Sequence, residues 1–205
     1  MKNQSTVEER GTVRVGGERY HVSIRILHWL MAVGFLFMWS CGYAMTSLVA
    51  DGSQMQEFLF GLHISTGVTL LILLLIRIAM RIRFTPPPLR EDLPKIERVG
   101  ARIGHLALYV LPALIIAVGW AETDFGGHGV KWFGVSMPKL FPTLKTLAGV
   151  NLEDATATIH QWLAYTMLAL AVVHVAAVVR HRWVDGHDVL HRMTLSAFPF
   201  ARDRH

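Results

Sequence analysis

The sequence predicts an all-α integral membrane protein, a four-helix bundle with both termini in the cytoplasm. Its basis is four stretches, each 19 to 25 residues long, that contain no Asp, Glu, Lys or Arg. A helix that spans a bilayer needs about 20 apolar residues, whereas helices of soluble cores rarely need so long an uncharged run. The uncharged stretches are Ile26–Ala50, Phe58–Ile76, Ile103–Ala121 and Ala155–Val179. We expect the spans at about 24–47, 57–80, 102–122 and 155–180.

The second observation is the placement of the basic residues, which predicts the topology. Five Lys or Arg residues lie in the N-terminal segment to Arg25, seven in the connection Arg77–Arg102 and five in the tail from Arg180. The other two connections hold three, all in the one that follows the third span. Cytoplasmic loops carry the excess of basic residues, so both termini and the middle connection are predicted to be cytoplasmic.

Composition limits the classes of protein that remain. We expect residues 1–205 to form a single transmembrane domain, with a polar and flexible segment over residues 1–20. Membrane orientation accounts for the net charge of +5, so nucleic-acid binding is not needed to explain it. The only cysteine, Cys41, lies inside the first span, and no CxxC or CxxCH occurs. This excludes an intrachain disulfide and argues against covalently attached c-type haem.

Two features of the third span and its following loop carry expectations about shape. Pro112 is expected to kink the third helix without interrupting the membrane crossing. The loop that starts at Glu122 is rich in Trp, Phe, Gly and Pro, which is typical of a segment that lies at the outer membrane surface.

Histidines inside the uncharged stretches are the third observation, because an ionisable group in hydrocarbon is costly without a partner. Five of the eleven histidines lie there: His28, His63, His105, His160 and His174. The predicted topology places His63 and His160 near the outer side, and His28 and His174 near the cytoplasmic side. The histidines therefore form two pairs at matched depths, with His105 left without a partner of its own.

The spacing of His160 and His174 adds a second constraint. Fourteen residues at about 100° each come within roughly 40° of four full turns, so both side chains share one helix face, about 21 Å apart along the axis. Two haem groups, each held by a pair of imidazoles, fit this geometry. A closed zinc site, with four ligands around one centre, fits it badly.

Other residues are candidates for supporting roles. Arg25 and Arg77 could pair with haem propionates at the cytoplasmic edge, although the positive-inside rule alone also explains them. His181 and Trp183 could form a quinone pocket there, whereas an aromatic belt is the alternative for Trp183. Small residues lie about one turn from each of the four paired histidines: Ala32, Gly67, Ala164 and Ala177.

Motifs in this order resemble the bacterial cytochrome b561 family, a branch of the membrane di-haem b cytochromes. The resemblance covers about residues 20–195. The matching motifs are RILHW at His28, GLHISTG at His63 followed by RIAMRIRFTPPP, RIGHLALY at His105, TIHQWLAY at His160, VVHVAAVVRH at His174 and the tail DVLHRM.

The resemblance implies an inner-membrane bundle that binds two non-covalent haem b groups. The family's axial ligand pattern carries onto the pairs His28/His174 and His63/His160. Family members exchange electrons between ubiquinone and a second partner, and one branch oxidises superoxide at the periplasmic face. This sequence departs from the family pattern in its longer and more polar N-terminus.

Two hypotheses for the function follow. In the first, the protein is a quinone-linked oxidoreductase whose periplasmic donor is superoxide or a redox protein. A positive outer end would steer superoxide, but its lysines, Lys131, Lys139 and Lys145, share this loop with acids that oppose them. These acids are Glu122, Asp124, Glu153 and Asp154.

In the second hypothesis, the protein is a haem b membrane-anchor subunit that relays electrons from a hydrogenase or dehydrogenase to quinone.

Overall fold

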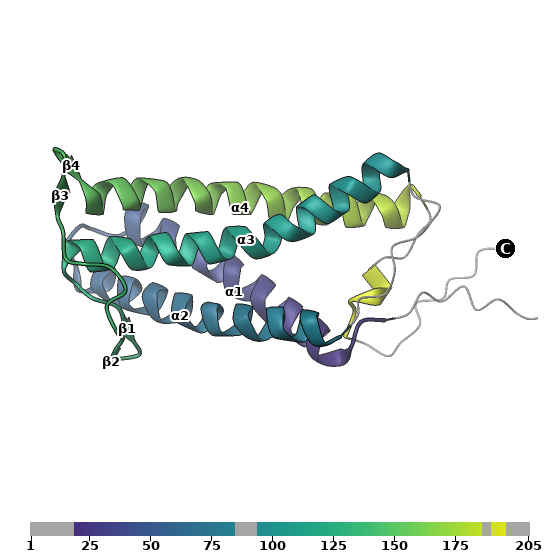
Figure 1. The fold of residues 1–205 in the computed structure, drawn as a ribbon, viewed down its shortest axis with the longest axis horizontal. Helices are drawn as coiled ribbons and strands as arrows, with labels where there is room; N and C mark the ends of the chain where they lie inside the picture. Colours follow the sequence, from purple (N-terminus) through teal and green to yellow (C-terminus); the bar gives the residue numbers. More distant parts are fainter. Residues whose placement is uncertain (1–18, 85–93, 186–189, 196–205) are drawn as a thin grey trace, which may run out of the picture.

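Four long helices make up most of the protein (Figure 1). The computed structural model describes residues 19–84, 94–185 and 190–195, and the predicted flexible segment falls almost entirely outside them. Each long helix is apolar enough to cross a membrane, which confirms the predicted all-α bundle of four spans. The helices are α1 (Val22–Ser47), α2 (Gln54–Arg83), α3 (Lys95–Gly126) and α4 (Leu152–Trp183).

The helices lie side by side with alternating direction, so the bundle has two distinct ends (Figure 1). We call the end where α2 and α4 begin the outer end, and the end where α1 begins and α4 stops the inner end. This naming follows the predicted topology, in which the inner end faces the cytoplasm.

Helix bounds differ from the predicted spans mainly at the charged ends. Helix α2 continues through Arg81 to Arg83, and α3 begins at Lys95, well before its uncharged stretch. The hydrogen bonds of a helix do not require apolar side chains, so the helix persists where it leaves the hydrocarbon. Helix α3 also continues past Glu122, where a loop was expected, and ends at Gly126. The next residue, Gly127, has a left-handed φ of 87° and forms the C-cap.

Helices α1 and α2 pack as one pair, and α3 and α4 as another. A buried cluster of Met31, Leu70 and Leu74 joins α1 to α2. The approach is close at Gly34, where an added Cβ would lie 2.8 Å from Leu70 Cδ2. Small residues at such contacts allow membrane helices to approach closely.

Pro112 lies inside α3 and leaves the helix continuous. Proline has no N–H to donate, so the carbonyl of Leu108 loses its helical hydrogen bond. Figure 1 shows a bend in the N-terminal half of α3, where such a loss is expected to act. The predicted kink is therefore present, and the N-terminal part of α3 leans toward α4.

Two small antiparallel hairpins cover the outer end. One pairs β1 (Lys131–Trp132) with β2 (Val135–Ser136), and the other pairs β3 (Thr146–Leu147) with β4 (Val150–Asn151). The first hairpin packs against α2, and the second joins the start of α4. Their position at the end of the bundle agrees with the outer surface segment expected from the sequence (Figure 1).

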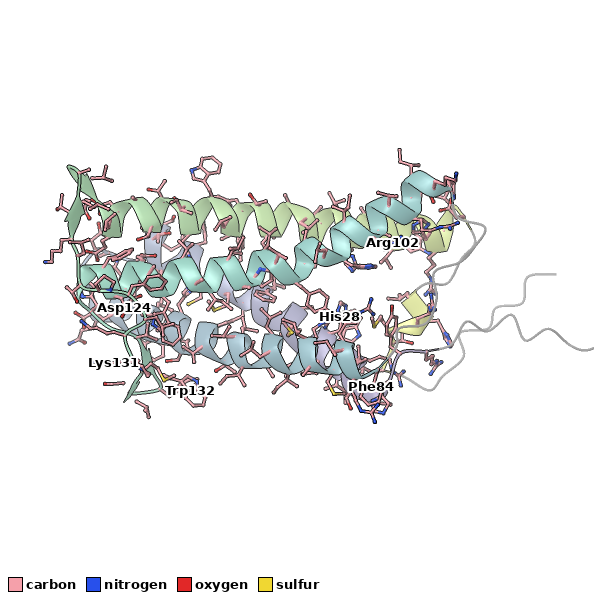
Figure 2. All side chains as sticks on the ribbon, in the orientation of Figure 1. His28, Phe84, Arg102, Asp124, Lys131 and Trp132 are labelled. Carbon is pink, nitrogen blue, oxygen red and sulfur yellow. The ribbon has the colours of Figure 1, made fainter. Side chains whose placement is uncertain are left out.

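Asp124 fastens this outer loop to α3. Its side chain is fully buried, and Oδ2 accepts hydrogen bonds from the backbone N–H groups of Leu140, at 2.9 Å, and Phe141, at 3.1 Å. Figure 2 shows Asp124 at the outer end of the helix. A single side chain at the end of a span thus holds a segment sixteen residues away.

Replacing Asp124 with alanine is expected to lower the free energy of unfolding by about 3 kcal/mol, because two backbone N–H groups lose their buried acceptor. Unfolding in mixed detergent micelles measures this change. Asp124→Asn, which keeps an acceptor oxygen, is expected to lose less. The exposed Asp154 provides the control. An equal loss of unfolding free energy in Asp154→Ala would contradict the role of Asp124 in fastening the loop.

The described ends of the chain meet at the inner end. The backbone N–H of Tyr20 donates to the carbonyl of Arg192 at 3.3 Å. Arg25 Nη1 donates to the carbonyl of Thr194 at 2.6 Å, and Trp29 Nε1 donates to that of Met193 at 2.9 Å. The short 3₁₀ helix η1 (Leu190–Arg192) belongs to this contact and is what the structure describes of the tail motif.

Candidate functional site: histidine pairs between the helices

The structure brings His63 and His160 together near the outer end. His63 comes from α2 and His160 from α4, and their ring centroids lie 6.1 Å apart with the planes at 69°. Bonds from a metal ion to imidazole nitrogen are about 2 Å long, so a metal between two rings holds the centroids roughly 6 Å apart. The spacing of this outer pair therefore fits a shared metal ion without a large rearrangement.

His160 is held in the tautomer that a metal ligand requires. Its Nδ1 lies 2.9 Å from the backbone carbonyl of Ile115 on α3. A carbonyl can only accept, so Nδ1 carries the proton and Nε2 keeps a free lone pair. Metal-ligating histidines are commonly fixed by such a bond to a backbone carbonyl. Nδ1 of His63 is buried and has no hydrogen-bond partner among the described residues.

Two glycines from the other helices leave room for this outer pair. An added Cβ on Gly42 of α1 would lie 3.4 Å from His63 Cε1. On Gly119 of α3 it would lie 2.9 Å from His160 Cε1, which is too close for the ring to stay in place. All four helices thus shape the space around the two imidazoles.

These two glycines were not predicted, because they lie on α1 and α3, and the small residues expected beside the ligands were all on the helices that carry the histidines. Gly67 is one of the four small residues expected near the ligands. A Cβ added there would lie 3.6 Å from Met38 Cε and would meet no histidine ring within 4 Å. Gly42 and Gly119 face the rings only because of how the helices pair, and a single sequence carries no signal of that pairing.

The inner end holds three histidines. The rings of His28 on α1 and His174 on α4 lie 6.4 Å apart between centroids, with the planes at 64°. His105 on α3 lies closer still, at 5.8 Å from His174. His105 was expected to have no depth-matched partner of its own, and the structure places its ring beside that of His174, a predicted ligand.

Arg77 from α2 enters this inner cluster. Its Nη2 lies 3.2 Å from His28 Nδ1, and its Nε donates to Tyr109 Oη at 3.2 Å, with the guanidinium 5.5 Å from the tyrosine ring centroid. Arginine only donates, so His28 Nδ1 accepts and Nε2 carries the proton. Binding of a metal by His28 Nε2 thus requires Arg77 to release Nδ1, so that the ring proton can move there from Nε2. Figure 2 labels His28 in this cluster.

The remaining predicted residues lie at the inner edge. Arg25 is buried, and its bond to Thr194 ties α1 to the tail. His181 Nδ1 lies 2.7 Å from Asp185 Oδ2, which forms a half-buried imidazole–carboxylate pair. Trp183 is 76% exposed at the end of α4. The structure does not bring Trp183 into contact with the histidine cluster through any ring interaction among the described residues.

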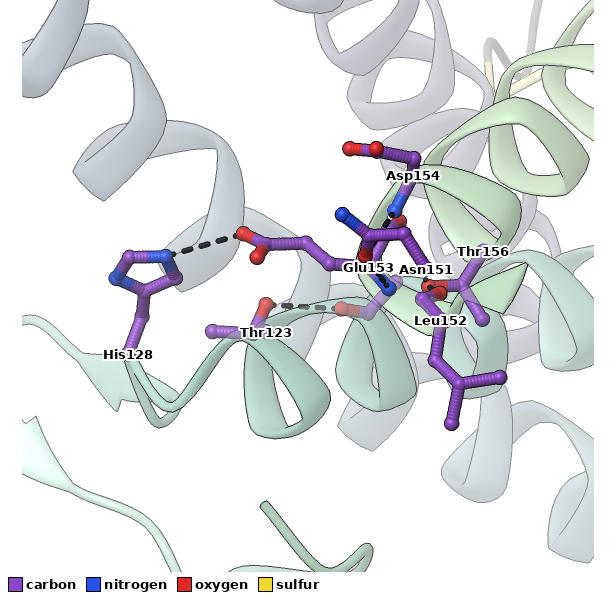
Figure 3. Close-up of polar contacts among 8 residues, drawn as sticks. Thr123, His128, Asn151, Leu152, Glu153, Asp154 and Thr156 are labelled. Atoms are coloured by element: carbon purple, nitrogen blue, oxygen red, sulfur yellow. Dashed lines mark hydrogen bonds and ion pairs between the residues drawn. The ribbon is translucent and has the colours of Figure 1, made fainter. Parts of the chain in front are cut away.

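Acidic side chains lie at the outer end, where α4 begins (Figure 3). His128 Nε2 lies 3.1 Å from Glu153 Oε1, and the side chain of Asn151 caps α4 by accepting from the N–H groups of Glu153 and Asp154. Glu153 faces Gly126 and lies two turns from His160 on the same side of α4. Negative charge therefore accumulates where α3 ends and α4 begins.

The donor set suits a cofactor with one imidazole on each side of its metal. Within the described residues, no group of three or more His, Cys, Asp or Glu side chains is placed to hold a metal ion, as a closed zinc site would need. The iron of haem b takes two axial ligands, and neutral imidazoles supply them in many membrane cytochromes.

Comparison with known proteins identifies the family. A family model described as "Prokaryotic cytochrome b561" matches residues 19–195. The chain is 33% identical to "Cytochrome b561 homolog 2" of Escherichia coli (strain K12) over 180 residues, which cover 86% of this chain and 91% of that protein. It is 27% identical to "Probable superoxide oxidase CybB" of Yersinia pestis over 172 residues, 82% of this chain and 90% of that protein. The chain belongs to the prokaryotic cytochrome b561 family and is a multi-pass, haem b-binding electron-transfer protein of the bacterial inner membrane.

Proposed function

We propose that the protein carries electrons across the membrane between a donor at the outer end and quinone at the inner end, with two haem b groups. His63 and His160 are the axial ligands of the outer site, and His28 and His174 those of the inner site. The observation that carries this proposal is the presence of two contacting imidazole pairs at the two ends of one helix face.

Haem iron, when bound, supplies a carrier that cycles between the ferric and ferrous states. The protein's own contribution differs between the two sites. At the outer site, the carbonyl of Ile115 fixes the proton of His160 on Nδ1, which orients the ring before any cofactor arrives. At the inner site, Arg77 and His105 add positive charge or hydrogen-bond donors beside His28 and His174.

Quinone chemistry at the inner end needs a group that exchanges protons. We assign this to His181, whose imidazole is paired with Asp185 at 2.7 Å and is half-buried beside the last turn of α4. The carboxylate stabilises a protonated ring, and the ring can return that proton to a reduced quinone oxygen. Trp183, exposed at the same level, offers an apolar face to the quinone ring or tail.

Superoxide is the donor that the comparisons favour, because a relative with 27% identity is described as a probable superoxide oxidase. The carboxylates of Glu153 and Asp154 at the start of α4 do not attract an anion. Because this charge repels an anionic donor, the alternative is that the protein is an anchor subunit and receives its electrons from a partner dehydrogenase.

Two measurements on the purified protein test the proposal. A reduced-minus-oxidised spectrum is expected to show a b-type α band, and a haem assay two haems per chain; absence of the band would end the proposal. A superoxide-generating system with added quinone is then expected to yield quinol. Quinol formation without a partner protein would exclude the anchor role, whereas its absence in a fully haem-loaded protein would exclude superoxide as the donor.

A further inference from the structure

An apolar groove lies at the outer end between α2 and the β1–β2 hairpin. Its volume is about 320 Å³. Gly61 and Ser65, two residues to either side of His63, point about 200° around the helix from it, so the groove is on the face opposite the histidine pair. The lining residues are Phe58, Gly61, Leu62 and Ser65 of α2, and Lys131, Phe133 and Gly134 of the hairpin.

The groove has the shape and polarity for a hydrocarbon chain. Gly61 forms an open floor, since a Cβ added there would meet no atom within 4 Å. The aromatic rings of Phe58 and Phe133 border it and remain 63% and 66% exposed. Exposed apolar side chains on a helix that spans a membrane lie against lipid, so we expect the groove to face the lipid.

The hairpin wall is fixed in place. The backbone N–H of Phe133 donates to Ser65 Oγ at 3.0 Å, and Trp132 Nε1 donates to Thr69 Oγ1 at 3.1 Å. Phe133 and Gly134 form the two-residue turn with φ values of 45° and 88°. Asn or Gly usually occupies the first of these positions, and a bulky ring rarely does. The ring of Phe133 is therefore held beside the groove against its backbone preference.

Lys131 places a positive charge on this otherwise apolar lining. Among the described residues, no carboxylate forms an ion pair with Lys131. Lys139 on the same loop differs, because its Nζ donates to Thr143 Oγ1 at 2.7 Å. The groove begins at the first turns of α2, the level at which hydrocarbon gives way to headgroups. An ammonium at that level is suited to a phosphate.

We propose that this groove binds one phospholipid of the leaflet at the outer end, with its phosphate on Lys131 and one acyl chain along Gly61 between the two phenylalanine rings. Glu57, one turn before Gly61 on α2, adds a carboxylate near the headgroup. It favours a headgroup with an ammonium, such as ethanolamine, over one that has only the phosphate charge.

Native mass spectrometry of the haem-loaded protein, exchanged into detergent with phosphatidylethanolamine, tests the site. The unsubstituted chain is expected to retain one phospholipid. Lys131→Gln, which removes a charge-assisted hydrogen bond, and Gly61→Leu, which fills the floor of the groove, are each expected to weaken its retention by about tenfold or more. Lys139→Gln and Gly104→Leu are the matched controls, since Gly104 also has open space around it on its helix.

Haem content and helicity, measured on the same samples, verify that both variants fold, because the groove faces away from His63. Equal lipid retention in the unsubstituted chain, Lys131→Gln and Gly61→Leu would overturn the proposal. So would a quinone, in place of a phospholipid, as the retained molecule. Weaker retention of phosphatidylglycerol than of phosphatidylethanolamine would support the role assigned to Glu57, and the reverse order would refute it.

Discussion

The His160→Ala variant is expected to bind one haem per chain in place of two. Removing the imidazole takes away one of the two axial ligands at the outer site, and no third histidine lies near His63 to replace it among the described residues. The inner cluster does not contact His160, so its haem is expected to remain. A pyridine haemochrome assay on protein of known concentration gives the ratio.

Gly119→Leu provides an independent variant for the same site. It keeps His160 but places a side chain where even a Cβ would lie 2.9 Å from the ring, so we expect the outer haem to be lost or to bind weakly. His128→Ala, which removes an exposed imidazole at the same end of the bundle, is expected to keep both haems. Two haems in both His160→Ala and Gly119→Leu would contradict the outer assignment.

His28→Ala is expected to lose the inner haem, whereas His105→Ala is expected to keep two haems. Both rings contact His174, at 6.4 Å and 5.8 Å between centroids, so spacing alone does not separate them. Arg77 bonds Nδ1 of His28 and has to release it before Nε2 can bind iron, so this contact does not select His28 either. The ligand pattern carried over from the family is what selects His28.

Haem content and the EPR spectrum of the ferric protein distinguish the two roles at the inner site. A positioning role for His105 predicts two haems with an altered signal from the inner one in His105→Ala. If instead His105→Ala contains one haem and His28→Ala contains two, then His105 is the ligand and our assignment is wrong. The outer signal, unchanged in both variants, is the internal control.

Much of the fold could be predicted because the membrane imposes it. Uncharged stretches of sufficient length defined all four helices, and Pro112 correctly indicated a bend in α3. The bounds were less accurate, since charged residues such as Arg83 and Lys95 remain helical outside the hydrocarbon. The hairpins could not be predicted, because strands of two residues have no periodicity to detect.

The pairing of the histidines could be predicted from their depth in the membrane. Depth matched His63 with His160 and His28 with His174, and the structure brings each pair together. His105 lies only two residues after the start of its uncharged stretch, so its depth also matches that of the inner pair. The bond from His160 to Ile115 depends on how α3 is rotated against α4, which no residue pattern in one sequence reveals.

The contacts between the two described ends of the chain have a consequence for biosynthesis. Arg25 and Trp29 lie near the start of the first helix, yet their partners Thr194 and Met193 follow α4, the last of the four helices. The inner end can close only after translation has passed residue 194, when all four helices are already made.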